Sequence, residues 1–293
     1  MSIAIVDFSW LLHRYKNSLK DLSCTRNGET IPTGHVYGTL KFVSELASKY
    51  SRVVLCVDSH NTKRKALFSG YKSNRHKPTG NWQFDYNVHL DVPNILAMLS
   101  IFPNVFYAEV EGYEADDLVA YFIRKSNNWD FYFRDNDILQ TKGAYRLMVS
   151  FSQPLVVGNE VDRKAHISEK FGIDKDWLPL LWKVVKGDAG DCIPIGLERF
   201  PSKDLSAICN QVEDDQISFA DLKALLLGHE YSGKWKEAIK ALDDPSSDWS
   251  EKLELNYNLV KPMLPEVVHL NRSECKDAKA LMQSYSIQPA AFL

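Results

Sequence analysis

The chain has 293 residues, of which 45% are hydrophobic, so it carries enough apolar material for a folded core. Its net charge of −3 excludes a generally basic nucleic-acid-binding protein, so any such surface must arise from a local cluster of cations. The five cysteines are scattered and form no Cys-x-x-Cys pair, which argues against a disulfide framework and a structural zinc site. With no signal peptide and no run of about 18 apolar residues, we expect a soluble cytoplasmic protein without a membrane partner.

Short apolar runs alternate with helix-like stretches through the first half of the chain. The runs are rich in β-branched or aromatic residues, as in buried parallel strands, and apolar residues between them recur at helical spacing. This alternation predicts an α/β fold with a mostly parallel central sheet flanked by helices. In chain order, the expected elements are a strand at 3–6, a helix at 36–50, a strand at 53–57, a helix at 92–101, a strand at 105–110, a helix at 115–125, a strand at 131–133 and a weaker strand at 147–151.

After about residue 167 the strand-like runs disappear and helical spacing predominates. Helices are expected at 176–186, 219–227, 234–242 and 249–260. We therefore expect an α/β core over residues 1–175 and a smaller helical C-terminal region over residues 176–293.

Acidic residues follow the first four expected strands. Because the carboxyl ends of parallel strands lie along one edge of a sheet, acids far apart in sequence should converge there. Converging carboxylates repel one another unless divalent cations bind them, and Mg²⁺ prefers oxygen ligands. Two metal ions about 4 Å apart suit displacement at a phosphodiester. Together with two acids in a later turn, the candidate ligands are Asp7, Asp58, Glu114, Asp116, Asp117, Asp135, Asp137, Asp188 and Asp191.

Taken singly, most of these acids have a simpler explanation. Asp116 and Asp117 suit a helix N terminus, whereas Asp135 and Asp137 suit a turn. An acid directly after a fully apolar strand, as at Asp7, is harder to explain as surface decoration. The presence of all the groups together therefore favours a metal site over separate structural roles.

The segment 63–77 carries six cations and no acid in a chain that is close to neutral. Such a cluster suits a phosphate backbone, and its position soon after Asp58 places it over the acidic edge of the sheet. Lys72 or Arg75 could stabilise charge that develops on a phosphate in a transition state. A solvated flexible loop is the alternative explanation. The cations are Lys63, Arg64, Lys65, Lys72, Arg75 and Lys77, and Tyr71 lies among them.

These residues occur in six short motifs whose order is itself informative. The motifs read Ile-Val-Asp7, Val-Asp58-Ser, Tyr71-Lys72-Ser-Asn-Arg75, Glu114-Ala-Asp116-Asp117, Asp135-Asn-Asp137-Ile-Leu-Gln and Gly187-Asp188-Ala-Gly-Asp191-Cys-Ile-Pro. In this order they resemble the flap endonuclease superfamily, and within it the bacteriophage 5′ nucleases and the 5′ nuclease domain of bacterial DNA polymerase I. The resemblance covers about two-thirds of the chain, from residue 3 to about residue 196.

The resemblance implies a PIN-like 5′ nuclease core that hydrolyses phosphodiesters with metal-activated water and leaves 5′-phosphates. Its cofactors would be two Mg²⁺ ions, for which Mn²⁺ can substitute. The implied substrates are DNA 5′ ends, flaps and nicks, with an RNA–DNA hybrid as a further candidate, and we expect a monomer. The first metal would lie at Asp7, Asp58, Glu114 and Asp116, with Asp117 nearby through water, and the second at Asp135, Asp137, Asp188 and Asp191.

The resemblance also implies how DNA is held. Lys72 and Arg75 match a basic pair at the base of a helical arch, here residues 71–92, and both would contact the scissile phosphate. A bacteriophage origin would fit, with work in DNA replication in the cytoplasm of a bacterial host. Further DNA contacts are expected at Lys63, Arg64, Lys65, Tyr71, Lys77, Arg199 and Lys203.

The sequence departs from the family pattern in two places. Phe133 and Arg134 precede the Asp-x-Asp pair, where the family has a small residue and a glycine. Where the family has a glycine-rich hairpin between two helices, only Gly196 remains, and Pro201 has no N–H to donate. We therefore expect the duplex anchor to be altered or lost, and we assign no monovalent-cation site.

Two other interpretations compete with the nuclease. An aspartyl-phosphate phosphatase would need a second acid two residues after Asp7, where the chain has Ser9. A catalytically weak relative that binds DNA junctions would be expected to lack metal ligands, yet all nine acids are present. The acids therefore favour an active metal-dependent nuclease.

Overall fold

A six-stranded sheet, in the order β5-β4-β1-β6-β7-β8, forms the centre of the computed structural model. The model describes residues 2–26, 28–76, 78–127, 129–147, 155–157, 165, 178–209, 211, 217–244 and 247–292. Neighbouring strands are parallel except for β8, which pairs antiparallel with β7. The expected mostly parallel sheet is confirmed. The strands are β1 (Ile3–Asp7), β4 (Arg52–Cys56), β5 (Val105–Ala108), β6 (Trp129–Tyr132), β7 (Tyr145–Leu147) and β8 (Leu155–Val157).

The ends of several strands differ from those expected. The strand expected at 131–133 begins at Trp129, and the one expected at 147–151 begins at Tyr145, while residues 148–151 lie outside the described residues. An apolar run shows where a strand is buried, but pairing with its neighbours decides where its ladder begins. The antiparallel strand β8 was not expected.

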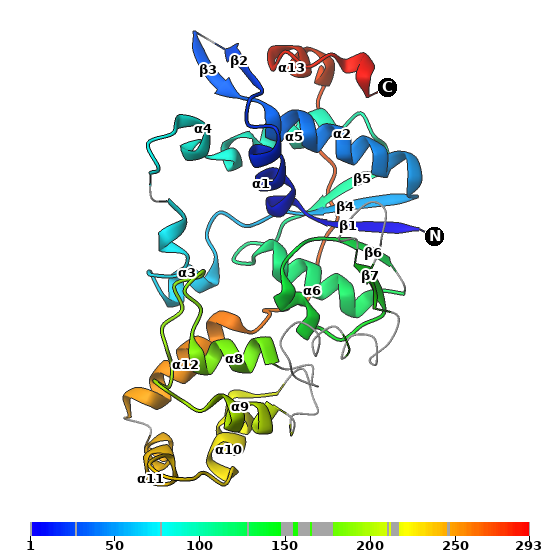
Figure 1. The fold of residues 1–293 in the computed structure, drawn as a ribbon. Coiled ribbons are helices and arrows are strands. Elements are labelled where there is room, and N and C mark those ends of the chain that lie inside the picture. Colours follow the sequence, from blue (N-terminus) through cyan, green and yellow to red (C-terminus); the bar gives the residue numbers. More distant parts are fainter. Residues whose placement is uncertain are drawn as a thin grey trace.

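Helices cover both faces of the sheet (Figure 1). Successive residues of β1 point to opposite faces, so Val6 packs in the cluster of α1, α2 and α5, while Ile5 packs in the cluster of α6. This arrangement buries the central strands on both sides, as their continuous apolar runs require. The helices are α1 (Phe8–Ser18), α2 (Gly34–Lys49), α5 (Val92–Leu99) and α6 (Ala115–Lys125).

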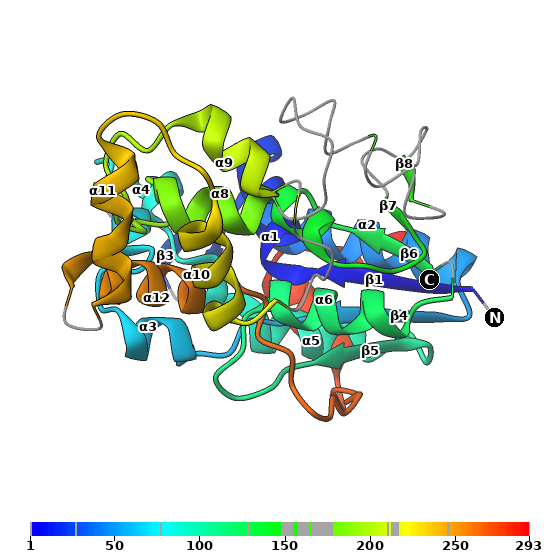
Figure 2. The same cartoon turned by 90° about the horizontal axis from the view of Figure 1, so that it is seen from below.

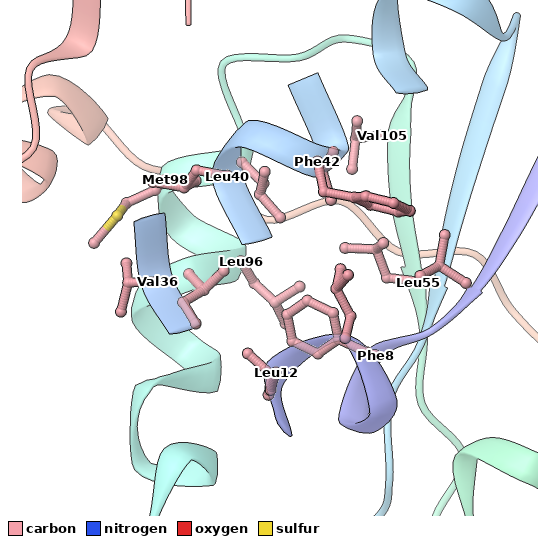
Figure 3. Close-up of a cluster of buried hydrophobic side chains, with 14 of the residues drawn as sticks. Phe8, Leu12, Val36, Leu40, Phe42, Leu55, Leu96, Met98 and Val105 are labelled. Atoms are coloured by element: carbon pink, nitrogen blue, oxygen red, sulfur yellow. The ribbon is translucent and has the colours of Figure 1, made fainter. Parts of the chain in front are cut away.

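Figure 3 shows the larger of the two layers, in which side chains from helices and strands interlock. Phe8 of α1, Leu40 of α2 and Leu96 of α5 pack over Leu55 of β4 and Val105 of β5. The burial of these side chains fixes the strands beneath them. The carboxyl ends of the strands are therefore held at defined positions.

Local capping explains two of the helix starts. The Asp7 carboxylate accepts a hydrogen bond from the Trp10 N–H at 3.0 Å and opens α1, a helix that we did not expect. Glu114 and Asp117 form a capping box at the start of α6, which begins and ends where the sequence predicts. A hairpin of β2 (Ser23–Arg26) and β3 (Glu29–Pro32) follows α1 and was also not expected.

The segment expected to form an arch, residues 71–92, leaves the carboxyl end of the sheet and returns beside α1 (Figure 1). The Lys16 ammonium of α1 donates to the carbonyls of Phe84 and Tyr86 at 2.5 and 2.8 Å. These contacts tie the far part of the segment to the core. Its elements, with the helix that precedes it, are α3 (Lys63–Leu67), η1 (Ser73–His76), α4 (Trp82–Asp85) and η2 (Val88–Asp91).

A helical region with its own core lies at the carboxyl end of the sheet (Figures 1 and 2). Leu181 of α8, Leu205 of α9, Leu222 of α10 and Leu253 of α12 belong to this core, and Tyr71 joins it from the base of the arch. No helix within the described ranges is long and apolar enough to cross a membrane. The elements are α8 (Leu178–Lys186), α9 (Ser202–Cys209), α10 (Phe219–Gly228), α11 (Trp235–Ala238), η4 (Ile239–Asp243) and α12 (Asp248–Val260).

The last part of the chain returns to the α/β core. We expected residues 176–293 to form the helical region, but beyond α12 the chain runs back along the sheet, where Asn271 pairs with Tyr107 of β5 through hydrogen bonds of 2.8 and 2.9 Å. The short helix α13 (Ala278–Ser284) then packs beside α5, and Tyr285 and Phe292 enter the core of the sheet. Apolar side chains near the C terminus are buried there. A contact with such a distant part of the chain cannot be predicted from a local sequence pattern. The 3₁₀ turn η5 (Pro289–Ala291) ends the described chain.

Candidate metal centre

A pocket with about 520 Å³ of space, open to solvent, lies between the carboxyl ends of the strands and the helical region. The candidate ligands that line the pocket are Glu114, Asp116, Asp117, Asp135, Asp137 and Asp191. Three further acids lie close to them. In addition to burial, the charge of Asp58 raises the pKa of Asp7, that of Asp7 raises the pKa of Asp116, and that of Asp188 raises the pKa of Asp137. Acids from the carboxyl ends of four strands, β1, β4, β5 and β6, therefore meet the turn after α8 in one place.

Asp7, the last residue of β1, and Asp58, which follows the neighbouring strand β4, lie side by side. The Ala115 N–H, at the start of α6, donates to Oδ1 of Asp58 at 2.6 Å, and the Ser9 hydroxyl donates to Oδ2. Burial and the charge of Asp58 raise the pKa of Asp7 to about 7. Burial and the charge of Asp7 likewise raise the pKa of Asp116 well above its usual range. The negative charge here is crowded and only partly solvated.

Glu114 is contacted by three side chains that can donate hydrogen bonds. The Lys72 ammonium lies 3.0 and 3.1 Å from its two oxygens, and the Tyr71 hydroxyl and the Arg64 guanidinium each donate to Oε2 at 3.1 Å. Despite its burial, Lys72 has its pKa raised by Glu114, so it is a cation at neutral pH. The base of the arch is thus linked electrostatically to a candidate metal ligand.

Asp117 is held by an arginine and by two backbone N–H groups. It forms a two-pronged ion pair with Arg64, at 2.7 and 2.8 Å, and also accepts the N–H groups of Glu114 and Met263. Only 1% of its side chain is exposed. With both oxygens engaged, Asp117 fits a structural role better than the water-mediated metal contact that the resemblance implied.

The acids that were expected to hold a second metal are contacted by a lysine that the sequence analysis did not single out. The Lys183 ammonium of α8 forms ion pairs with Asp137 and Asp188. Burial and the charge of Asp135 raise the pKa of Asp137 to about 6 even though Lys183 opposes the shift. At Asp188, burial is outweighed by the Lys183 contact, and the pKa is lowered. Asp137 belongs to the 3₁₀ turn η3 (Asn136–Gln140), and Asp135 caps this turn, because its carboxylate accepts the Asp137 N–H at 3.0 Å.

The arch base meets the turn after α8 through main-chain and side-chain contacts. Arg75 lies 2.5 Å from Oδ1 of Asp191, and the Lys72 N–H donates to the Asp191 carbonyl at 2.9 Å. Lys72 has a φ of 55°, in the left-handed region that favours glycine. A bulky residue held in this conformation at a candidate site is consistent with a side chain whose direction is fixed by function.

The acids fit divalent metal ions by their chemistry. All the candidate ligands are carboxylates, which suit Mg²⁺ or Mn²⁺, and the raised pKa values of Asp7, Asp116 and Asp137 indicate a repulsion that a bound cation would relieve. Among the residues that the structure describes, no three His, Cys, Asp or Glu side chains already surround one point. The side chains therefore have to rotate to complete a ligand set.

The predicted DNA-contacting residues fall into two classes. Arg64 and Tyr71 are buried, with 5% and 4% of their surface exposed, so the prediction that they contact DNA does not fit their positions. The other described members of this group are exposed: Lys63, Lys65, Arg199 and Lys203. Lys77 lies outside the described residues. Of the two residues that depart from the family pattern before the Asp-x-Asp pair, Phe133 is buried in the core and Arg134 is exposed.

The turn that joins α8 to α9 contains Gly196 and also a residue other than glycine in the left-handed backbone conformation. The N–H groups of Gly196 and Leu197 donate to the Val185 carbonyl at 3.1 and 2.9 Å, and the Phe200 N–H donates to the Leu197 carbonyl at 3.3 Å. Arg199 lies within this turn at a φ of 58°. An exposed cation therefore stands where the backbone favours glycine.

The contacts that Lys183 and Ser9 make with the acids are not predicted from the sequence. Ser9 stands where a phosphatase would have its second acid, and its hydroxyl donates to Asp58. Lys183 had a visible signal, because it is a cation within the apolar helix α8, close in sequence to Asp188. Its partner Asp137 lies far away in the sequence, so only the fold shows the pairing.

Comparison with known proteins identifies the family. The family model for the 5′-3′ exonuclease, N-terminal resolvase-like domain, matches residues 2–172. The chain belongs to the 5′-3′ exonuclease family. A 5′-3′ exonuclease of Aquifex aeolicus is 26% identical over 284 residues, with 94% of this chain and 86% of the relative covered. DNA polymerase I of Caldicellulosiruptor bescii is 28% identical over 205 residues, which cover 66% of this chain and 22% of the polymerase.

Solved structures of 5′-3′ exonucleases and flap nucleases share the fold. A T5 5′-exonuclease with bound zinc ions matches with a TM-score of 0.62 and 17% identity, covering all of this chain and 97% of the other. The catalytic core of Rad2 in complex with a DNA substrate matches with a TM-score of 0.53 and 13% identity, covering 99% and 90%. Membership of the family places the protein among nucleases rather than phosphatases.

Proposed function

We propose that the protein is a structure-specific 5′ nuclease that hydrolyses DNA phosphodiesters with two Mg²⁺ ions and leaves 5′-phosphate products. The observation that carries the proposal is the pocket in which acids from the strand ends and the α8 turn meet the cations of the arch base. A T5 flap endonuclease is described in a complex with DNA and metal ions, and Rad2 in a complex with a DNA substrate. Both descriptions fit a DNA substrate for this chain.

Two groups of carboxylates would hold the metal ions, with Mn²⁺ able to replace Mg²⁺. When bound, the ions would supply an activated water and would stabilise charge on the phosphate oxygens. The first group is Asp7, Asp58, Glu114 and Asp116, and the second is Asp135, Asp137, Asp188 and Asp191. We leave Asp117 out of both groups because Arg64 and two backbone N–H groups use both of its oxygens.

Lys72 and Arg75 would act on the scissile phosphate. In the structure each is paired with an acid of the pocket, Lys72 with Glu114 and Arg75 with Asp191. Metal binding would neutralise these acids and free the two cations to contact a phosphate. A fixed cation near the reacting phosphate stabilises charge that grows in the transition state.

The exposed cations outline a path for the DNA backbone on both sides of the pocket. Lys63 and Lys65 lie on α3, below the arch, whereas Arg199 and Lys203 lie at the turn between α8 and α9. We propose that the helical region, from about residue 176, contacts the duplex through this turn, and that the arch receives the 5′ single strand. Cationic side chains would then bind duplex phosphates that backbone N–H groups bind in a glycine-rich turn.

Cleavage of 5′-labelled flap and nicked duplex DNA tests the proposed function. We expect short 5′-phosphorylated products with Mg²⁺ and none with a chelator. Uncut substrate in the presence of Mg²⁺ or Mn²⁺, with junction binding intact, would instead support a catalytically weak DNA-binding relative.

Asp135→Asn separates metal chemistry from substrate binding. Asp135 is exposed and has no lysine or arginine partner among the described residues, so the change removes a charge without breaking an ion pair. We expect cleavage to be lost while flap DNA still binds. An equal loss of binding would mean that the acid supports the DNA-binding surface rather than a metal.

A further inference from the structure

A single lysine of α8 contacts acids from two parts of the chain. The Lys183 ammonium lies 2.5 Å from Oδ2 of Asp188 and forms a second short ion pair with Oδ2 of Asp137. Asp137 lies in η3, between β6 and β7 of the sheet, whereas Asp188 follows α8, so the cation joins the α/β core to the helical region. The three side chains are mostly buried, with 20% of Lys183, 28% of Asp137 and 21% of Asp188 exposed.

The local charge explains why a lysine is stable at this position. The acids Asp135, Asp137 and Asp188 repel one another in a partly desolvated site. The ammonium offsets this repulsion, and despite burial the two carboxylates raise the pKa of Lys183, so it keeps its charge. Without such a cation, neighbouring buried carboxylates would separate or take up a proton.

The two groups of candidate ligands differ in how many of their acids are already paired with a lysine or an arginine. Of the four acids in the first group, only Glu114 is paired with a lysine or arginine among the described residues. Of the four acids in the second group, all but Asp135 are paired within the same part of the chain. A divalent cation that reaches the second group therefore has to displace protein cations from its ligands.

We infer that Lys183 is a resident counter-ion of the second group, which holds Asp137 and Asp188 in place and leaves them when a divalent cation binds. This inference rests on the proposed two-metal function. An ammonium and a divalent ion at contact distance from the same carboxylates repel one another in a partly buried site, so each weakens the binding of the other. Lys183 is thus a positioning residue that makes the second ion bind more weakly than the first.

A direct contact with DNA phosphate is the other role open to a lysine in this pocket. That role would leave metal binding unaffected when DNA is absent. The two roles therefore make opposite predictions for metal binding to the protein alone.

Mn²⁺ binding to the whole protein without DNA tests the counter-ion role. Electron paramagnetic resonance measures free Mn²⁺ during titration of the wild type, Lys183→Met and Lys186→Met, and thermal unfolding shows that each variant is folded. Lys186 is the matched control, because it lies one turn further along α8 and its ammonium donates to the Phe200 carbonyl rather than to an acid. Lys183→Gln provides the same test with a side chain that still hydrogen-bonds to both acids.

We expect Lys183→Met and Lys183→Gln to bind the second Mn²⁺ at least tenfold more tightly than the wild type, with the first site unchanged. Lys186→Met should match the wild type, and Lys183→Arg, which keeps the charge, should leave the second site weak. A second site that is unchanged or weaker in Lys183→Met would overturn the inference.

Flap cleavage by the wild type keeps this outcome separate from the proposed function. If the wild type leaves the flap uncut with Mg²⁺, the proposed function fails. If it cuts the flap but the Mn²⁺ isotherms of the wild type and Lys183→Met coincide, only the counter-ion role fails.

Discussion

The Arg64 guanidinium holds both oxygens of the Asp117 carboxylate, at 2.7 and 2.8 Å, inside the protein. Arg64 also donates to the carbonyls of Leu259 and Lys261, at 2.7 and 2.9 Å, so the pair joins the start of α6 to the end of α12. The acid that looked like a ninth metal ligand is thus part of the contact between the sheet and the helical region.

Arg64→Met should destabilise the fold, because it leaves a buried carboxylate and two carbonyls without their partner. We expect the free energy of unfolding to fall by about 3–5 kcal/mol, as measured by urea unfolding without metal. Arg75→Met is the control, since its ion pair with Asp191 leaves 53% of the arginine side chain exposed and should contribute about 0–1 kcal/mol. Equal losses in the two variants would show that burial of the Arg64 pair has no special effect.

Lys72→Met should slow the chemical step far more than it weakens DNA binding. Loss of one charge-stabilising donor typically lowers the rate by about 10²–10³-fold. Single-turnover cleavage at saturating enzyme measures the chemical step, and flap binding in Ca²⁺ measures affinity. Lys65→Met, on the exposed face of α3, should weaken binding and leave the saturated rate unchanged. The reverse pattern in Lys72→Met would make this lysine a phosphate anchor only.

Metal binding should release protons near neutral pH. The folded protein raises the pKa of Asp7 to about 7 and that of Asp137 to about 6, both from 3.8, so between about pH 4 and pH 7 the folded state holds protons that the unfolded chain has lost. The stability of the metal-free protein should therefore fall as the pH rises through this window.

Thermal unfolding with EDTA and with Mg²⁺, at pH 5 and pH 7.5, measures this effect. We expect Mg²⁺ to raise the melting temperature more at pH 7.5 than at pH 5, because protons compete with the metal at the lower pH. Calorimetry of Mg²⁺ binding at pH 6, in buffers with different ionisation enthalpies, should give a net proton release. Proton uptake, or a metal-free melting temperature that rises from pH 5 to pH 7.5, would contradict the assignment of these carboxyls.

Tyr285→Phe should destabilise the fold although it removes only a hydroxyl. That hydroxyl donates to the buried Asp91 carboxylate at 2.6 Å, while His35 and Tyr86 contact the other oxygen, both at 2.8 Å. Loss of the bond should lower the free energy of unfolding by about 1–3 kcal/mol, as measured by urea unfolding. Ser284→Ala, next in sequence and exposed, should stay within about 0.5 kcal/mol of the wild type, and a similar effect in both variants would refute the role of this bond.

Gly196→Ala should strain the turn that joins α8 to α9. An added Cβ would lie 2.5 Å from the Val184 carbonyl oxygen and 2.7 Å from Cδ2 of Leu253, so the backbone has to shift. We expect a loss of about 1–3 kcal/mol in urea unfolding. Gly228→Ala, at the end of α10 with open space around it, should be neutral or slightly stabilising. No difference between the two variants would show that the packing around Gly196 can relax.

The sequence predicts the sheet and the place where the acids meet because both depend on local patterns. A buried parallel strand is a short apolar run, and an acid at its end has to lie at the carboxyl edge whatever the loops do. The start of α6 is equally local, since Glu114 and Asp117 cap it within one turn.

The partner of each acid could not be predicted, because it depends on long-range packing. Asp117 and Asp116 are neighbours in sequence, yet one faces Arg64 and the other lies in the crowd of carboxylates. Arg64 was counted with the DNA-binding cations for the same reason, since its burial depends on carbonyls of α12 almost 200 residues later. Sequence alone shows which charges are present but not which of them neutralise each other.

The return of the chain from α12 to β5 also bears on the order in which the molecule can be made. Met282, Tyr285, Ile287 and Phe292 complete a core whose other buried side chains come from the first 132 residues. During synthesis from the N terminus, the sheet therefore emerges long before the residues that seal one of its layers. We expect the nascent α/β core to stay incompletely packed until the residues up to Phe292 have left the ribosome.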